Sequence, residues 1–186
     1  MKKVIMITGH LAALKSTIAS QLGHDLKIIV FCKDKIKEIL GDTIGFETRA
    51  ENLKLSEATF KLMADGMVQT LLVNDLVILE SNFRPYEVEE IKRRCSELGY
   101  ELIVVFLSGS PHVLYQRYLD RQSRRHKVHT STGTIQFEAF QSIMKPFDSS
   151  LYGNQTILVD TTTFDEKDYL ELFNQILKRI KEIHTK

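Results

Sequence analysis

The chain has 186 residues, with 25 Lys and Arg against 24 Asp and Glu, so its formal net charge is +1. This balance excludes no small ligand, but it gives no sign of a nucleic-acid or membrane-surface partner, and neither is expected. The length favours one domain over residues 1–186, and two cysteines at no metal-like spacing, Cys32 and Cys95, favour reduced thiols in a soluble, cytoplasmic protein.

The first element is a short apolar strand, expected over Val4–Thr8, that runs into the loop "GHLAALKST". It is too short to span a bilayer and meets no small-residue cleavage site, so we interpret it as a buried strand and not as a signal peptide. A phosphate-binding loop has glycine, four free positions, glycine, lysine and serine or threonine. Gly9 stands at the correct distance from Lys15, but Leu14 replaces the second glycine.

Four further apolar runs alternate with helical patterns along the chain. They are rich in Val, Ile and Leu and mostly lack polar alternation, which is typical of strands covered on both faces. Strand and helix in alternation predict an α/β fold with a parallel sheet. The further strands are expected at Lys27–Cys32, Leu76–Leu79, Leu102–Leu107 and Thr156–Val159.

Helices are expected between these strands and at the end of the chain. Lys15 leads into one, Pro85 into a second, and Ser110 with Pro111 begins a third. Residues 41–69 have a helical pattern and are expected to shape the acceptor pocket. The stretch "RRHKVHTSTGT", residues 124–134, is expected to be a mobile loop. The last helix has one apolar face, made by Tyr169, Leu172, Phe173, Ile176, Ile180 and Ile183.

The first loop has the residues that phosphate binding requires. In a parallel sheet the first strand-to-helix turn is where a phosphate meets helical N–H groups. The Lys15 ammonium can reach the β- and γ-phosphates, and the Ser16 hydroxyl suits Mg²⁺. The predicted cradle comprises Gly9, His10, Leu11, Ala12, Ala13, Leu14, Lys15, Ser16 and Thr17.

Leu14 is expected to weaken nucleotide binding. A leucine must either adopt a strained backbone angle, at roughly 1–3 kcal/mol, or reshape the loop.

Three further polar residues follow the second and third strands. Asp34 is a candidate base for an attacking hydroxyl or, alternatively, a helix cap. Glu80 is a candidate Mg²⁺ or substrate ligand, the alternative being an exposed acid at a strand end. Arg84 can meet a substrate anion or be an ordinary surface arginine.

Arg117 and Arg121 lie one helical turn apart, in a stretch with more basic residues beyond. Like charges at this spacing repel unless an anion lies opposite them. One interpretation is a lid that closes over a triphosphate and spreads the transition-state charge; the other is that Asp120 pairs with Arg117 and Arg124. His126 and His129 lack the further ligands that a metal site would need.

These segments resemble the P-loop small-molecule kinases of the AAA_33 type, relatives of the chloramphenicol phosphotransferase, zeta-toxin and polynucleotide-kinase families. The resemblance runs through most of the chain and rests on "GHLAALKST", "KDKIKEIL", "VILESNF" and "RYLDRQSRRHKVH". It implies a three-layer P-loop NTPase fold, like that of nucleoside-monophosphate kinases. A five-stranded parallel sheet would have helices on both faces, with a lid over about residues 117–134. It also implies ATP and Mg²⁺, a base at Asp34, and lid arginines at Arg117, Arg121 and Arg125.

The leading hypothesis is an ATP-dependent kinase for a hydroxyl group of a small molecule, working as a monomer or homodimer. The second is a nucleotide-binding regulator without phosphotransfer, which the degenerate loop at Leu14 favours. The third is a toxin of the zeta type or a kinase for nucleic-acid ends, against which the near-neutral charge argues. The joint presence of Lys15, Asp34, Glu80 and the lid arginines favours the enzyme.

Overall fold

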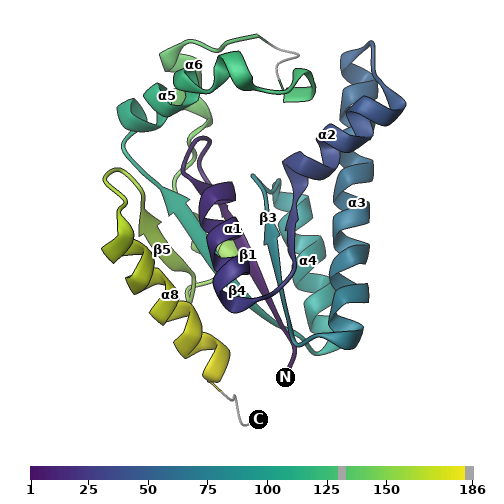
Figure 1. The fold of residues 1–186 in the computed structure, drawn as a ribbon, viewed down its shortest axis with the longest axis vertical. Helices are drawn as coiled ribbons and strands as arrows, with labels where there is room; N and C mark the ends of the chain where they lie inside the picture. Colours follow the sequence, from purple (N-terminus) through teal and green to yellow (C-terminus); the bar gives the residue numbers. More distant parts are fainter. Residues whose placement is uncertain (130–132, 183–186) are drawn as a thin grey trace.

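A computed structural model describes residues 1–129 and 133–182 (Figure 1). Its centre is a five-stranded sheet in the order β2-β3-β1-β4-β5, with every pair parallel. All five expected strands are confirmed, and the parallel α/β fold with them. Their bounds are β1 Lys3–Gly9, β2 Val30–Cys32, β3 Leu76–Glu80, β4 Glu101–Ser108 and β5 Ile157–Asp160.

The second strand is shorter than the sequence predicts. Lys27 lies just after helix α1 (Lys15–Leu26) in the left-handed region, at φ 56°, and its N–H donates to the His24 carbonyl at 3.2 Å. A left-handed residue that closes a helix in this way cannot belong to an extended strand. The strand therefore begins only at Val30.

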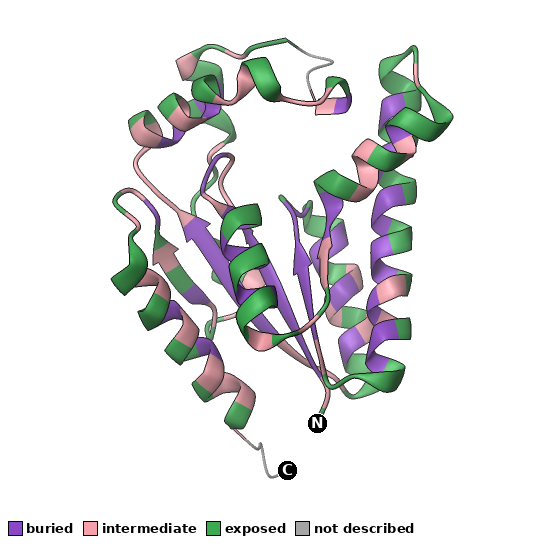
Figure 2. Cartoon of the chain, in the orientation of Figure 1, coloured by how far each residue is buried: buried purple, intermediate pink, exposed green. Residues whose placement is uncertain are grey.

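Two hydrophobic layers sandwich the sheet, because successive side chains of a strand point to opposite faces. In β1, Val4 and Met6 belong to one buried cluster, while Ile5 and Ile7 belong to the other. Helices α1 and α8 (Glu166–Lys181) cover one face, and α3 (Arg49–Val73) and α4 (Pro85–Leu98) cover the other. The strands are buried between exposed outer helix faces (Figure 2), which confirms the three-layer arrangement.

The helical stretch expected over residues 41–69 is in fact interrupted. Helix α2 (Lys33–Ile44) ends before Gly45, and Thr48 caps α3 by a reciprocal pair of hydrogen bonds with Glu51. This capping box starts a new helix, so α2 and α3 are two separate helices that lie beside the sheet.

The segment between β4 and β5 is built of short pieces. The described parts are α5 Pro111–Asp120, 3-10 turns at Gln122–Arg124 and Lys127–His129, α6 Phe137–Ile143 and α7 Ser149–Tyr152. Part of the loop expected to be mobile is therefore regular structure. Residues 130–132 of that loop, and Ile183 of the last helical face, lie outside the described residues.

The structure bears on two further expectations, which concern the two cysteines and membrane-spanning helices. Cys32 and Cys95 are both buried and free. Across residues 1–129 and 133–182, no helix combines the length and the apolar character needed to cross a bilayer.

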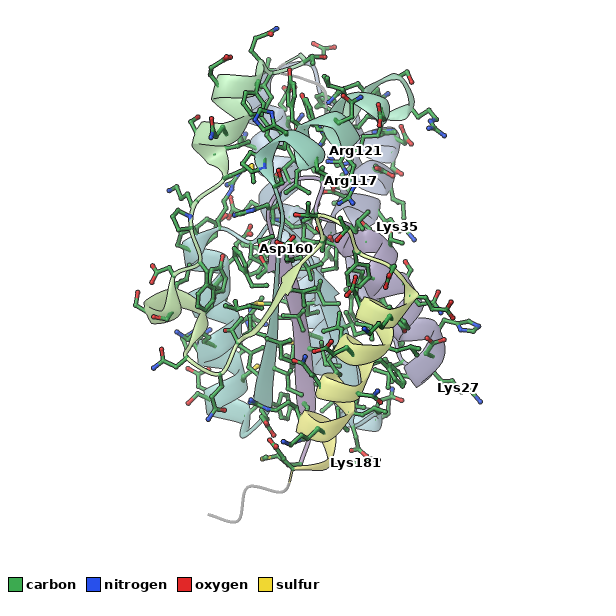
Figure 3. All side chains as sticks on the ribbon, turned by 90° about the vertical axis from the view of Figure 1, so that its left-hand side faces the viewer. Lys27, Lys35, Arg117, Arg121, Asp160 and Lys181 are labelled. Atoms are coloured by element: carbon green, nitrogen blue, oxygen red, sulfur yellow. The ribbon has the colours of Figure 1, made fainter. Side chains whose placement is uncertain are left out.

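Arg117 and Arg121 lie together at the carboxyl end of the sheet, and Lys27 and Lys181 lie at its opposite end (Figure 3).

Candidate active site

The loop after β1 begins at the carboxyl end of the central strand of the sheet. Gly9 has φ +128°, and a Cβ there would lie 2.0 Å from the Leu107 carbonyl oxygen of β4. The next N–H, that of His10, donates to the same oxygen at 2.8 Å. Only glycine fits this close approach of two backbones, so the first residue of the loop pattern has a structural reason.

Leu14, the residue in place of the second glycine, has φ 57° and ψ 16° in the left-handed region. Of the two options expected for it, the leucine thus adopts the strained angle, at about 1–2 kcal/mol. Ala12, at φ 64°, has the same conformation. The Leu14 side chain packs against the buried cluster on the α1 face of the sheet, and that burial offsets part of the strain.

Lys15 is buried below this loop, with 8% of its surface exposed. Its Nζ donates to the His10 carbonyl oxygen at 2.6 Å, which closes the loop around the ammonium group. Burial lowers the pKa of Lys15 to about 8, although the carboxylates of Glu80 and Asp34 oppose this shift. A buried cation of this kind gains from the approach of an anion.

Glu80 ends β3, in register with Ile7 of β1 and Cys32 of β2. The alternative of an exposed strand-end acid is wrong, because only 4% of Glu80 is exposed. The Cys32 thiol donates to its Oε2 at 2.8 Å. Burial raises the pKa of Glu80, while the Cys32 hydrogen bond and the Lys15 charge act in the opposite direction.

The Ser16 hydroxyl and the Glu80 carboxylate supply the hard oxygen ligands that Mg²⁺ takes in proteins. The described residues contain no group of three or more His, Cys, Asp and Glu side chains suited to a metal ion. The donor set fits Mg²⁺ held by one or two protein oxygens together with the phosphates of a nucleotide, the common arrangement for this ion.

Asp34 lies in the first turn of α2, and the alternative that it caps this helix is wrong. The cap position belongs to Cys32, which makes no side-chain cap, and Asp34 follows two residues later. The Asp34 side chain is 64% exposed, and its Oδ1 lies 3.9 Å from Nδ1 of His129. Its carboxylate is therefore available to a substrate.

The arginines expected in the lid, about residues 117–134, have different surroundings. Arg117 donates to the carbonyl oxygens of Thr161 and Thr162, at 2.8 and 3.2 Å, in the loop after β5. Asp120 instead accepts a hydrogen bond from Gln116, so the alternative interpretation, in which it pairs with Arg117 and Arg124, is wrong. The Arg117 guanidinium therefore holds a loop.

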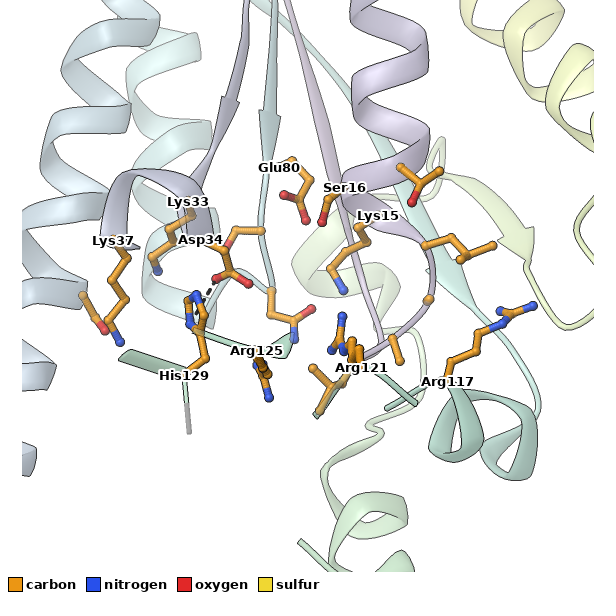
Figure 4. A pocket seen from close by; sticks show the side chains of 18 of the residues that line it. Lys15, Ser16, Lys33, Asp34, Lys37, Glu80, Arg117, Arg121, Arg125 and His129 are labelled. Atoms are coloured by element: carbon orange, nitrogen blue, oxygen red, sulfur yellow. Dashed lines mark ion pairs between the residues drawn. The ribbon is translucent and has the colours of Figure 1, made fainter. Parts of the chain in front are cut away.

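Arg121 lies next to Lys15, and its charge lowers the pKa of that lysine (Figure 4). The Arg121 Nε is buried and has no hydrogen-bond partner among the described residues. Burial, and secondly the charge of Arg125, lower the pKa of Arg121. Arg125 lies over the ring of Tyr118, 6.0 Å from its centroid. Both guanidinium groups thus have hydrogen-bonding capacity left for an anion.

The lid is fastened to α2 by a set of contacts that we call the lid–α2 contact. Its polar pairs are His129 Nε2 with Glu38 Oε1 at 2.9 Å, and His126 Nε2 with Asp42 Oδ1 at 3.0 Å. Between the histidines, Val128 is 1% exposed and lies against Gly41. The two histidines therefore pair with carboxylates of a facing helix.

Glu87, in the first turn of α4, fixes the start of α2. Its carboxylate is 0% exposed, forms an ion pair with Lys33 Nζ, and accepts from the Arg84 N–H at 2.9 Å. The Lys33 ammonium also lies 5.7 Å from the centroid of the Phe60 ring of α3. The residue before Asp34 is thus held to two other helices.

These groups surround one cavity of about 380 Å³ at the carboxyl end of the sheet (Figure 4). Its wall brings together residues 11–17 of the loop with Asp34, Glu80, Arg84, Arg117, Arg121 and Arg125. Gly9 and His10 line a neighbouring cavity instead. Six other residues of the wall were not predicted from the sequence to line the site: Lys33, Lys37, Ser56, Ser81, Asn82 and His129. Lys33 and Lys37 had a usable signal, because they are four residues apart, which places two positive charges one helical turn apart beside Asp34.

The chain is similar in sequence to a family of known proteins and to two curated kinases. The family model described as Zeta toxin matches residues 1–178. Shikimate kinases from two strains of Bacillus anthracis are 29% identical over 183 residues, covering 97% of this chain and 99% of theirs.

Two solved structures share the fold. A candidate kinase from Chloroflexus aurantiacus has a TM-score of 0.81 at 24% identity, covering 95% of this chain and 97% of its own. Kti12 from Chaetomium thermophilum, in complex with ADP-AlF3, has a TM-score of 0.68 at 15% identity and covers 96% of this chain and 100% of its own.

Proposed function

This chain belongs to the zeta-toxin family of P-loop kinases, and we propose that it transfers the γ-phosphoryl group of ATP to a hydroxyl group of a small molecule. The observation that carries the proposal is the convergence of one buried lysine, two carboxylates and two arginines on a single cavity. They come from the loop after β1, from α2, from the end of β3 and from the lid. Phosphoryl transfer needs positioning and charge stabilisation more than covalent chemistry by the protein.

Each residue has a separate task in this proposal. Asp34 takes the proton of the acceptor hydroxyl as the oxygen bonds to the γ-phosphorus and the bond to ADP breaks. Lys15 and the backbone N–H groups of the loop bind the β- and γ-phosphates. Arg121 and Arg125 stabilise the charge of the transition state. Arg117 holds the loop after β5 beside this site.

Ser16 and Glu80 would hold Mg²⁺ with the nucleotide. The ion neutralises phosphate charge and orients the phosphates when it is bound. Arg84, exposed at the rim of the cavity, is the proposed contact for an anionic group of the substrate.

The test is the variant Asp34→Asn. Asparagine keeps the size and an acceptor oxygen but cannot take a proton, so folding and ATP affinity are expected to stay nearly unchanged. Phosphotransfer to a true acceptor is expected to fall by roughly 10²–10⁴-fold. ADP release with a panel of alcohols measures the reaction, and calorimetry measures ATP affinity. Full activity in the variant would show that Asp34 is not the general base.

A second candidate is a nucleotide-binding regulator, and the left-handed Leu14 favours it. Strain next to the phosphate-binding lysine weakens the loop as a catalytic cradle without removing its N–H groups. ATP binding without ADP release on any alcohol of the panel would select this candidate.

A further inference from the structure

The cavity of about 380 Å³ around Lys15 is called the phosphate cavity from here on. A second cavity, of about 790 Å³, lies beside it. It is formed by the carboxyl ends of β1 and β4, the start of α4 and the segment from Ile143 to Tyr152. Leu11 and Asn82 line both cavities. The two spaces therefore share a wall next to the phosphate-binding loop.

Aromatic rings make up much of this second cavity. Phe106 is 5% exposed, and its ring centroid lies 5.5 Å from that of Phe147 and 5.2 Å from that of Tyr152. The rings of Phe147 and Tyr152 stack on each other, 5.9 Å apart and 19° from parallel. Phe83, from the loop after β3, is buried in the same wall. Such walls suit a flat apolar body, which can stack on them.

Some of the polar groups of the cavity are engaged by the protein and others are not. The Asp148 carboxylate accepts from the N–H and the hydroxyl of Ser150, at 2.9 and 2.6 Å, and His10 Nε2 lies 2.9 Å from the Lys145 carbonyl oxygen. The other ring nitrogen of His10, Nδ1, is buried and has no hydrogen-bond partner among the described residues. The Asn82 carboxamide, at the shared wall, makes no hydrogen bond to another described residue. Polar recognition is therefore available at Asn82, where the two cavities meet, and at His10 of the phosphate-binding loop.

We propose that this cavity holds the body of the phosphoryl acceptor, and that the acceptor is an alcohol on an aromatic or similarly flat apolar skeleton. This inference rests on the proposed kinase function. The body stacks among the rings, and the hydroxyl passes Leu11 and Asn82 into the phosphate cavity. There its oxygen bonds to the γ-phosphorus, the bond to ADP breaks and the proton passes to Asp34.

The same walls discriminate against polyols. A compact polyhydroxylated acceptor such as shikimate would set its hydroxyl groups against ring faces that offer them no hydrogen bonds, and unpaired buried hydroxyl groups oppose binding.

The experiment measures binding of two probes, 2-phenylethanol and indole-3-ethanol, by saturation-transfer NMR with a non-hydrolysable ATP analogue present. Shikimate is the polyol control. The variant Ile143→Asp places a charge on the cavity wall, at a side chain already 55% exposed, and is expected to weaken binding of the aromatic alcohols at least about tenfold. Leu72→Asp, on α3 outside the cavity and 62% exposed, is the matched control and is expected to leave binding unchanged.

Three results would overturn the inference: no saturation transfer to either aromatic alcohol at millimolar concentration, tighter binding of shikimate, or equal binding in the wild type and in Ile143→Asp. A parallel assay of ADP release separates this proposal from the kinase function. ADP release with shikimate alone would keep the kinase and reject the aromatic acceptor. Binding of aromatic alcohols without ADP release on any alcohol would reject the kinase function, and with it the acceptor role of the cavity.

Discussion

At the scale of single residues, the phosphate loop contains a strained leucine that can be tested directly. Leu14→Gly removes the left-handed strain at φ 57°, and we expect ATP binding to tighten by up to the whole of that strain, about 1–2 kcal/mol. Calorimetry measures the affinity. If binding weakened instead, the loop would depend on the leucine side chain where it packs against the α1 face.

Lys27 offers a matched control for this change, because it has φ 56° at the opposite end of the sheet. Lys27→Gly relieves the same kind of strain far from the phosphates. It is expected to raise the melting temperature and to leave ATP affinity unchanged.

The buried Lys15 should make the protein less stable while it makes the site functional. Since burial lowers its pKa to about 8 from the ordinary lysine value of 10.5, the folded state binds this proton less tightly than the unfolded state. The resulting loss of stability is fully present below pH 8 and disappears as pH rises to 10.5.

Lys15→Met is therefore expected to raise the free energy of unfolding by about 1–2 kcal/mol at pH 7, after allowance for the lost bond to His10. It should also abolish ATP binding, because the charge-assisted phosphate contact is gone. Denaturant melts measure the first effect and calorimetry measures the second. A variant that was less stable at pH 7 but equally stable at pH 10.5 would contradict the sign of this argument.

At the scale of helices and loops, the lid–α2 contact brings His129 of the lid to within 3.9 Å of Asp34, the proposed base. We expect His129→Ala to remove the pair with Glu38 and to loosen the lid where it contacts α2. Hydrogen exchange measures the effect: amides of residues 125–129 should exchange at least about tenfold faster, since a lost hydrogen bond to a charged group is worth roughly 1.5–3 kcal/mol.

The matched control for the lid is His24→Ala, because His24 lies on α1 with 85% of its side chain exposed. It should leave exchange in the lid unchanged. Unchanged exchange in both variants would show that the rest of the lid–α2 contact, the His126 pair with Asp42 and Val128 buried against Gly41, holds the lid without the His129 pair.

At the scale of the whole molecule, the charge is unevenly distributed. The chain carries +1 in total, yet seven Lys and Arg residues line the phosphate cavity, against the two carboxylates of Asp34 and Glu80. A cavity of one sign concentrates an oppositely charged ligand, and salt screens this effect. The association rate of ATP is expected to fall about tenfold or more between 0.01 M and 1 M salt. Stopped-flow measurements test this, with uncharged adenosine as the control that should change little.

The sequence predicts the fold well because apolar runs and helical periods are local signals. The five strands and the loop spacing from Gly9 to Lys15 follow from them. The break between α2 and α3 is less visible, because Gly45 and the Thr48 cap interrupt a pattern that is helical on both sides.

The walls of the site could not be predicted in the same way, because they depend on packing between distant segments. His129 reaches Asp34 only through the fold, and burial of Glu80 depends on β2 lying beside β3. The aromatic cavity joins Phe106 of β4 to Phe147 and Tyr152, which are about forty residues further along the chain. No local pattern of residues marks such a junction.

The position of β1 in the middle of the sheet has a consequence for how this protein can diversify. The phosphate loop continues from a strand flanked on both sides, and Gly9 touches its neighbour so closely that the loop cannot shift without disturbing the sheet. Residues 143–152, in contrast, belong to the connection between β4 and β5, outside the sheet itself. Exchange of residues 143–152 alone between related chains, with the lid left in place, should alter acceptor preference while nucleotide affinity is inherited intact, which makes this short segment a natural unit for recombination.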